Sequence, residues 1–521
     1  MRREFPVALD LATVDLKKLI DRRHPDYEGA LAQWDFCKLA FLGGREWMTE
    51  ENLFKFYKEG ASEYKERKDR TYRENHVKRV IDTINQFLFK QKPMRSEKAP
   101  ELLRKFWKKA SRDGKSMDRF ALELDQWQSV YGMFFVVVDR PTVAADLRKD
   151  EKLPYAYIVP PQNLLDMSYD DQGEFNWVLI LEKQRVDDNP MAESAINSRF
   201  RLWTRDEWIL FGLDEKNEPM YIARNAHNLG VVPVVKVASD VSCRYSSPAL
   251  IGDIVYMDRA LVNYGSMLDE ILYQQTFSQL TLPAEAVLPG TAEMGQIIAA
   301  SKQRVFLYNG LAGGKPEFIS PDASQARLII EAMDRTMKNI YAVSGTDHEA
   351  NSQSMSAGKS YASGKARQYD YSAIENILVA KSVAIEQAEE QIAALVLKWM
   401  GDNTEIDTAW VQYPEKFDIR GLTAELDMAL ELWKTTPPVE MARKHMKVIN
   451  DKMFTRQSDV ERDTMHAAID KWTPDYSVAL NIEQQVADDG TKIADATVMS
   501  AEAAVEAANK TENAEPKDEA K

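Results

Sequence analysis

Apolar residues recur along the chain at two different spacings, which separate helical from strand-like regions. Between residues 73 and 89, and again between 117 and 132, apolar side chains recur every three or four residues, the period of one helix face. The predicted apolar positions are Val77, Val80, Ile81, Ile84, Phe87 and Leu88 in the first helix, and Phe120, Leu124, Trp127 and Val130 in the second. The run "MFFVVVDRP" (133–141) begins continuously apolar and valine-rich, so it predicts a buried strand.

Short strand-like runs continue from residue 154 to residue 237. The polar stretches "YDDQGE", "LDEKNEP" and "HNLG" separate them, and their Asp, Asn, Gly and Pro residues favour turns. Short strands joined by short turns predict an antiparallel sheet. Together with the helices around it, this sheet predicts a mainly helical α+β fold.

Beyond residue 246 the pattern predicts two helices that enclose a β-like insertion. Ser247 is expected to be the N-cap of the first helix, with Pro248 at its first helical position, and the helix to run for roughly 30 residues or ~45 Å. The second helix is expected to begin at Asp322 and to stop at Gly345. Between them, "LTLPAEAVLPG" and "RVFLYNGLAGGKPEFISP" indicate short strands on either side of a weak helix.

A Ser/Gly-rich stretch, "SQSMSAGKSYASGK" (352–365), opens a helical run of about forty residues that ends at Gly401. Such a helix spans ~60 Å, longer than a small domain is wide, and small residues along its stripe would let a neighbouring helix approach closely. Lys381 and Gln391 interrupt the stripe, so the helix fits a simple coiled coil poorly. A strand-like piece, "AWVQYPEKFD", and compact helices through Trp472 follow.

Composition and length indicate an ordinary soluble protein of two to four domains: 521 residues, 44% apolar and 29% charged. No apolar run approaches the ~20 residues that cross a bilayer, and the N-terminus lacks the apolar core of a secretory signal. The two cysteines, Cys37 and Cys243, are far apart, which argues against a disulfide scaffold and favours a reducing cytoplasm.

The net charge of −15 argues against a protein that coats DNA. Residues 51–120 are an exception, because Lys and Arg there outnumber Asp and Glu by almost two to one. A solvated basic face explains that segment better than a nucleic-acid site does. The acidic, Ala-rich end of the chain, 483–521, is predicted to be disordered.

The sequence lacks the motifs that would support an enzyme. In "AGKS" the second glycine of a phosphate loop would be Gly358, but the position five before it is Gln353, and a predicted helix rather than a strand precedes the loop. The six histidines have no paired spacing and no cysteine cluster nearby, so no metal site is predicted. There is no Gly-x-Ser-x-Gly elbow either, and we expect no catalytic residue and no cofactor.

The order of these features resembles the portal proteins of tailed bacteriophages and closely related prophage proteins. The segments that carry the resemblance are "WQSVYGMFFVVVDRP", "PYAYIVPPQNLLDM", "NLGVVPVVKV", "SSPALIGDIVYMDRALVNYGSMLDEIL", "PEFISPDASQARLIIEAMDRTMKNIYAVSG" and "SMSAGKSYASGKARQYDYSAIENIL". The resemblance covers roughly residues 50 to 470. It leaves out the extreme N-terminus and the acidic tail.

The resemblance implies a subunit with wing, stem, clip and crown around a central channel. Its expected parts are a wing at 1–245, a stem helix at 246–277, a clip at 278–321, a second stem helix at 322–345, a tunnel loop at 346–360, a long channel helix at 361–401, a return strand of the wing at 402–419, a helical crown at 420–482 and the acidic tail at 483–521.

It also implies the function of a portal. A ring of about twelve copies at one capsid vertex would conduct double-stranded DNA during packaging, retain the genome, hold the neck and tail, and release the genome on ejection. The implied partners are the chain itself, the terminase large subunit, the major capsid protein and scaffold, and the neck adaptors. The protein would be assembled in the host cytoplasm, become part of the virion, use no membrane, and catalyse nothing itself.

Three sets of residues receive roles from the resemblance. The tunnel-loop set, whose small polar and few basic residues suit DNA that must slide, is Ser352, Ser354, Ser356, Gly358, Lys359, Ser360, Lys365 and Arg367. The stem set, either acids that repel phosphate or halves of ion pairs between subunits, is Asp253, Asp258, Asp269, Glu270, Glu331 and Asp334, with Arg259, Arg327 and Arg335. The clip set is Pro283, Phe306, Tyr308, Pro316 and Phe318.

Two other classes of function stay open from the residues. One is a cytoplasmic scaffold that oligomerises through the long helix, and the β-like insertion between two helices speaks against it. The other is an enzyme that processes nucleic acid through the basic segment, for which no catalytic constellation is present.

Overall fold

The computed structural model is a mixed helix-and-sheet structure, as the sequence predicts, and it divides into two compact units, Met1–Phe417 and Asp418–Lys521. The residues it describes are 15–141, 153–186, 195–214, 216–239, 245–275, 279–283, 306–308, 317–319, 324–346, 364–402, 404–414, 417, 437–454, 457 and 459–473. The expected acidic tail lies outside these residues.

The first unit begins with helices. They are α1 (Leu16–Ile20), α2 (Tyr27–Leu42), the 3₁₀ turn η1 (Arg45–Trp47), α3 (Ala61–Arg70), α4 (His76–Leu88), α5 (Glu101–Lys108) and α6 (Met117–Tyr131). The two helices expected from apolar spacing, α4 and α6, are confirmed. Their apolar faces are buried, with Val80, Ile84 and Leu124 fully out of contact with solvent.

Two sheets follow, both assembled from the predicted strand region. The strands are β2 (Met133–Asp139), β3 (Tyr155–Val159), β4 (Leu164–Tyr169), β5 (Phe175–Val186), β6 (Ala195–Thr204), β7 (Glu207–Leu213), β8 (Pro219–Ala226) and β9 (Val234–Ala238), with the 3₁₀ turn η3 (Pro161–Asn163) before β4. One sheet has the order β3-β2-β9 and the other the order β4-β5-β6-β7-β8, and every pairing is antiparallel. Every residue of β2 is buried, as its apolar run predicts.

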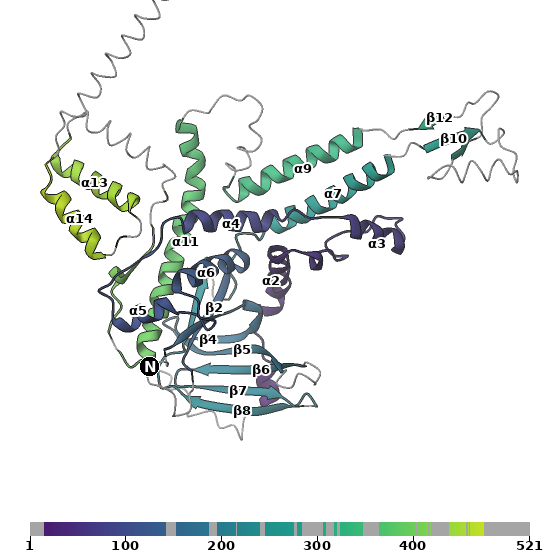
Figure 1. Ribbon diagram of the computed structural model, residues 1–521. Coiled ribbons are helices and arrows are strands. Elements are labelled where there is room, and N and C mark those ends of the chain that lie inside the picture. The colour runs from purple at the N-terminus through teal and green to yellow at the C-terminus, as the bar shows by residue number, and fades with distance from the viewer. Residues whose placement is uncertain are drawn as a thin grey trace, which may run out of the picture. The chain divides into compact units, whose positions relative to one another are not determined.

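Two long helices come next, α7 (Ile254–Gln275) and α9 (Ser324–Val343). They lie side by side and run in opposite directions (Figure 1). The three strands between them in sequence, β10 (Gln279–Pro283), β11 (Phe306–Tyr308) and β12 (Glu317–Ile319), form a small sheet with β10 in the middle. The expected β insertion is therefore confirmed, while the weak helix expected inside it lies outside the described residues.

The expected start of α7 at Ser247 is wrong, because the helix begins at Ile254. Ser247 is buried, and a Cβ placed on Gly132 would lie only 2.2 Å from its carbonyl oxygen. The amide of Ile251 donates to the carbonyl of Ser129, so this stretch is folded against the end of α6 in turns. Packing has overridden the capping signal, and α7 is 22 residues or ~33 Å long rather than ~45 Å.

The long helix is confirmed as α11 (Gly364–Trp399), 36 residues and ~54 Å. Gly401 ends it with a φ of +75°, and the amide of Asp402 donates to the carbonyl of Leu397. The helix contacts α4, α5, α6, β2 and β9, so this late part of the chain packs against helices and strands from the first half of the sequence (Figure 1).

The strand expected from "AWVQYPEKFD" is only two residues long, β13 (Val411–Gln412), and follows the 3₁₀ turn η5 (Thr408–Trp410). It pairs with β1 (Met94–Arg95) and with neither of the larger sheets. Pro414 lacks a backbone N–H, and the amide of Tyr413 donates to Glu386 of α11 instead of extending the strand.

The second unit contains α13 (Val439–Met453) and α14 (Asp459–Lys471), two of the compact helices expected before Trp472. Lys447 and Asp470 form an ion pair of 2.7 Å between them, and the Arg443 guanidinium donates to the carbonyl of Trp472.

Candidate functional site

The helix pair α7–α9 carries all of the stem candidates except Asp253, and polar contacts hold α7 to the N-terminal part of the chain. The amide of Phe54 donates to Asn263 at 2.9 Å, Arg67 donates to Ser266 at 2.8 Å, and Arg70 pairs with Glu270 at 2.6 Å. Asn263 and Gly265 point to opposite sides of α7, since each residue turns the helix by about 100°.

The opposite side of α7 carries α9. A Cβ built on Gly265 would lie 3.9 Å from the Met333 methyl group, so the small residue lets the two helices approach. The segment around α3 and the helix α9 therefore cover opposite faces of α7. The α3 segment, α7 and α9 therefore lie in a row, with α7 in the middle. The outer side of the α3 segment and the outer side of α9 are the two flanks of this row, and they are made of different residues.

Asp258 is not a channel-facing acid, which corrects its place among the stem candidates. Its side chain is fully buried, and Arg73, with a side chain only 4% exposed, donates to it at 2.6 Å. Burial raises the pKa of Asp258 although Arg73 opposes the shift, and burial lowers the pKa of Arg73. The pair joins α7 to the residues just before α4 within the same chain, so the Asp258 carboxylate is already paired and is not exposed for an ion pair with another chain.

Two more stem candidates are engaged within the chain. Glu270 pairs with Arg70, and the guanidinium of Arg259 lies over the rings of Phe36, Phe54 and Tyr256 at 5.1–5.4 Å. Asp269 is partly buried, and burial raises its pKa while Arg70 opposes the shift. The remaining stem candidates are exposed: Asp253, Arg327, Glu331, Asp334 and Arg335.

Several large apolar side chains of the pair are also exposed. They are Tyr256, Met267, Leu272 and Tyr273 on α7, and Leu328, Ile330 and Val343 on α9. Tyr273 is 57% exposed and Leu328 65% exposed. Exposed apolar side chains also occur elsewhere among the described residues, for example at Tyr57, Ile196 and Val460.

The long helix α11 is held to the body of the unit by a buried charge that sequence reasoning misread. Lys381 donates to Asp125 at 2.8 Å and to Ser129 at 2.8 Å, both on α6. Its side chain is 8% exposed and that of Asp125 is fully buried. Lys381 therefore belongs to the buried face of α11 and does not interrupt it.

A second charged contact holds α11 about two turns further along the helix, at Glu389. Arg95 forms a two-pronged contact with Glu389, at 2.6 and 2.9 Å, and also pairs with Asp118 at the start of α6. Tyr413 donates to Glu389 at 2.7 Å. Burial alone would lower the pKa of Arg95, but the Glu389 carboxylate raises it above its usual value, so the arginine stays charged. Sequence reasoning did not find these residues.

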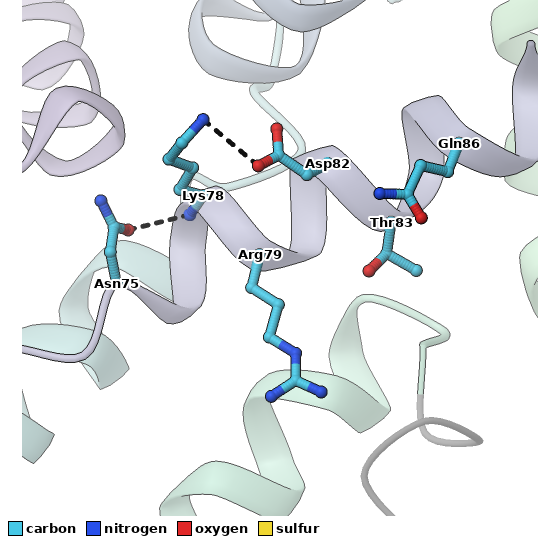
Figure 2. Close-up of a pocket in the computed structure, with 6 residues that line it drawn as sticks. All are labelled: Asn75, Lys78, Arg79, Asp82, Thr83 and Gln86. Carbon is cyan, nitrogen blue, oxygen red and sulfur yellow. Dashed lines mark hydrogen bonds and ion pairs between the residues drawn. The ribbon is translucent and has the colours of Figure 1, made fainter.

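A polar hollow of about 390 Å³ lies along one face of α4 (Figure 2). It is lined by Asn75, Lys78, Arg79, Asp82, Thr83 and Gln86. Lys78 pairs with Asp82 at 3.2 Å, and Asn75 caps the helix by accepting from the amide of Lys78. The hollow is open to solvent, and its charged side chains are two cations, Lys78 and Arg79, and one carboxylate, Asp82.

The clip candidates converge in the small sheet. Pro283 stands opposite Tyr308, and Phe306 and Phe318 flank β10 on its two sides, opposite Thr281 and Leu280. Pro316 lies outside the described residues.

Most of the tunnel-loop candidates lie outside the described residues: Ser352, Ser354, Ser356, Gly358, Lys359 and Ser360. Lys365 and Arg367 fall in the first turn of α11.

No protein-family model matches the chain, and no curated protein matches it. Among solved structures the chain is similar to the neck of an empty GTA particle computed with C6 symmetry, with 10% identity, a TM-score of 0.35, and coverage of 68% of this chain and 84% of that one. It is also similar to the neck of a native GTA particle computed with C12 symmetry, with 11% identity, a TM-score of 0.36, and coverage of 68% and 83%. TM-scores this low show neither a shared fold nor a shared function.

Within the described ranges, no group of three or more His, Cys, Asp or Glu side chains is placed to hold a metal ion. None of the helices in that part of the chain combines the length and the apolarity that crossing a membrane requires. Cys37 is buried, and burial raises the pKa of its thiol to about 12.

Proposed function

We propose that the chain is a portal-type subunit that assembles into a ring of about twelve copies and conducts double-stranded DNA at a capsid vertex. The ring would serve packaging, retention and ejection of the genome and would hold the neck and tail. It would act without catalysis of its own, in contact with the terminase large subunit, the major capsid protein and scaffold, and the neck adaptors.

The observation that carries the proposal is the arrangement of α7, α9 and α11. Two helices side by side enclose a small sheet in sequence, and a 36-residue helix follows, anchored in an α+β body. This is the order of stem, clip, stem and channel helix that the sequence resemblance implies.

The unlike flanks of the row support a ring. Residues around α3, such as Tyr57, are exposed on one flank, and Leu328 and Glu331 of α9 are exposed on the other. Contact between two different flanks is heterologous, and such contacts close into rings when the rotation between copies divides a full turn.

The scaffold alternative is less well supported. Its signature would be an α11 whose apolar seam is free to pair with another copy. That seam is instead occupied within the chain, where Lys381 and Glu389 contact α6 and β1.

Native mass spectrometry and negative-stain imaging of the purified protein test ring formation directly. We expect a ring of about a dozen copies with a central hole. A protein that stays monomeric in the presence of capsid scaffold and also cleaves DNA would refute the proposal.

Deletion of residues 351–358 tests the DNA-facing role of the loop. The ring should still assemble, while particles should package or retain less DNA. Deletion of residues 143–150, an equal length from the long connection between the paired residues Asp139 of β2 and Tyr155 of β3, is the matched control and should leave retention unchanged. Normal packaging and retention by the 351–358 variant would mean that this loop does not act on DNA.

A further inference from the structure

The most buried residues of α9 lie in its last turn. Among the described side chains of the helix Ile340 and Tyr341 are buried, and burial continues at Ser344 and Thr346 just beyond it. Met333 and Met337 are half-buried against the core, so the helix has contacts along its length, but its most buried anchor is at its C-terminal end.

The backbone of Tyr341 organises the turn that ends α9. Its carbonyl accepts from the amide of Thr346 at 2.9 Å and from the Ser344 hydroxyl at 3.0 Å. The amide of Gly345, with a φ of +69°, donates to the carbonyl of Ala342. These bonds form a Schellman motif, which fixes the direction in which the chain leaves the helix.

The side chain of Tyr341 ties the same turn to α4. Its hydroxyl lies 2.9 Å from Nδ1 of His76, the first residue of α4, and the guanidinium of Arg79 lies 5.7 Å from its ring centre. Figure 2 shows Arg79 reaching away from α4 toward a neighbouring helix. Because Val77 and Val80 of α4 are fully buried in the core, α4 is a fixed reference for whatever it holds.

We propose that Tyr341 is a positioning residue that couples α4 to the turn at Gly345. It fixes the point and direction from which the chain enters residues 347–363. This inference rests on the proposed function, in which that stretch contains the loop that meets DNA. On this view, DNA retention depends on the anchor as well as on the loop's own residues.

The test is Tyr341→Phe, which keeps the ring and removes only the hydroxyl. The matched control is Tyr256→Phe on α7, which also loses one hydrogen bond, of 2.7 Å to Gln33. Hydrogen exchange at Gly345 and Thr346 should be about two- to tenfold faster in Tyr341→Phe, the range expected for one hydrogen bond, and unchanged in Tyr256→Phe. Ring assembly should persist, and particles carrying Tyr341→Phe should retain less DNA than wild type.

Unchanged exchange in Tyr341→Phe would overturn the coupling. Faster exchange together with wild-type retention would overturn its role in positioning. The deletion of residues 351–358 separates this result from the proposed function. If that deletion retains DNA normally, the proposed function fails, while the exchange measurement still decides whether Tyr341 couples α4 to the turn.

Discussion

Replacing Lys381 with methionine is expected to destabilise the first unit by ~3–5 kcal/mol, the cost of leaving a buried charge without its partner. The structure places the substitution at the upper end of what single changes do. Asp125 is fully buried, Lys381 is its cation at 2.8 Å, and its second oxygen has no hydrogen-bond partner among the described residues. Methionine fills a similar volume, so the loss reflects charge rather than a cavity.

The partner substitution Asp125→Leu separates the charge from the packing. The double variant replaces the ion pair with apolar side chains, and such replacements are often neutral or stabilising. We therefore expect the double variant to be more stable than Lys381→Met alone, with a coupling energy of ~2–3 kcal/mol between the two sites.

Urea unfolding followed by tryptophan fluorescence measures these differences. With an m value of roughly 3 kcal/mol/M, Lys381→Met should lower the midpoint by about 1 M or more. A midpoint within ~0.2 M of wild type would show that the charge is not buried as described. Losses that simply add in the double variant would show that Lys381 and Asp125 do not interact.

Three further substitutions test separate features. Gly132→Ala would bring a Cβ to 2.2 Å from a backbone carbonyl oxygen and should destabilise the protein by ~3 kcal/mol or more in thermal melts. The control Gly173→Ala, also at positive φ but with open space around it, should cost only ~1 kcal/mol. Equal losses of stability in the two variants would contradict the close contact at Gly132. Burial lowers the pKa of His76, so its contribution to stability is present above pH ~6.5 and is lost as the pH falls from there toward the lower folded-state pKa. His76→Gln should accordingly show a smaller drop in melting temperature between pH 7.5 and 5.5, and an unaltered drop would rule out this histidine as a source of acid sensitivity. Glu389→Gln should cost ~3 kcal/mol because it removes the buried carboxylate of Arg95 and leaves that arginine only the half-exposed Asp118. Glu375→Gln on the exposed side of the same helix should cost almost nothing, and similar melts for the two would argue against the buried pair.

Local patterns predicted the elements whose partners lie close in sequence or whose burial is continuous. The period of Val77, Val80 and Ile84 identified α4, and the unbroken apolar run identified β2, because burial of one face or of both faces leaves a direct trace in residue order. The start of α7 was misjudged because Ser247 and Pro248 are good capping residues locally, whereas the close packing against Gly132 is decided by a distant part of the chain.

The charged anchors of α11 could not be predicted for the same reason. Leu378, Lys381, Ile385, Ala388 and Ile392 are spaced by three and four residues, so Lys381 falls on the buried seam, but nothing near it in sequence neutralises its charge. Its partner Asp125 is 256 residues away on α6, where the buried Gln128 and Ser129 lie beside it.

Part of the basic excess of residues 51–120 has a similar explanation. The side chains of Arg67, Arg73 and Arg95 are at most 11% exposed and pair with acids inside the unit. The partners of Arg73 and Arg95, Asp258 and Glu389, lie far along the chain. A count of charges within a segment cannot show this, because it does not separate arginines used in the interior from those at the surface.

The distance in sequence between Arg95 and Glu389 also limits how early the first unit can finish folding during synthesis. The two residues are 294 positions apart, so at ~5–20 residues per second the arginine waits about 15–60 s for its carboxylate to be synthesised. During that interval Arg95 is already synthesised, but the Glu389 carboxylate that pairs with it in the folded unit is not. Folding of the first unit is therefore expected to complete only after α11 has left the exit tunnel, and a chain terminated before residue 364 should be recognised by proteases as unfolded.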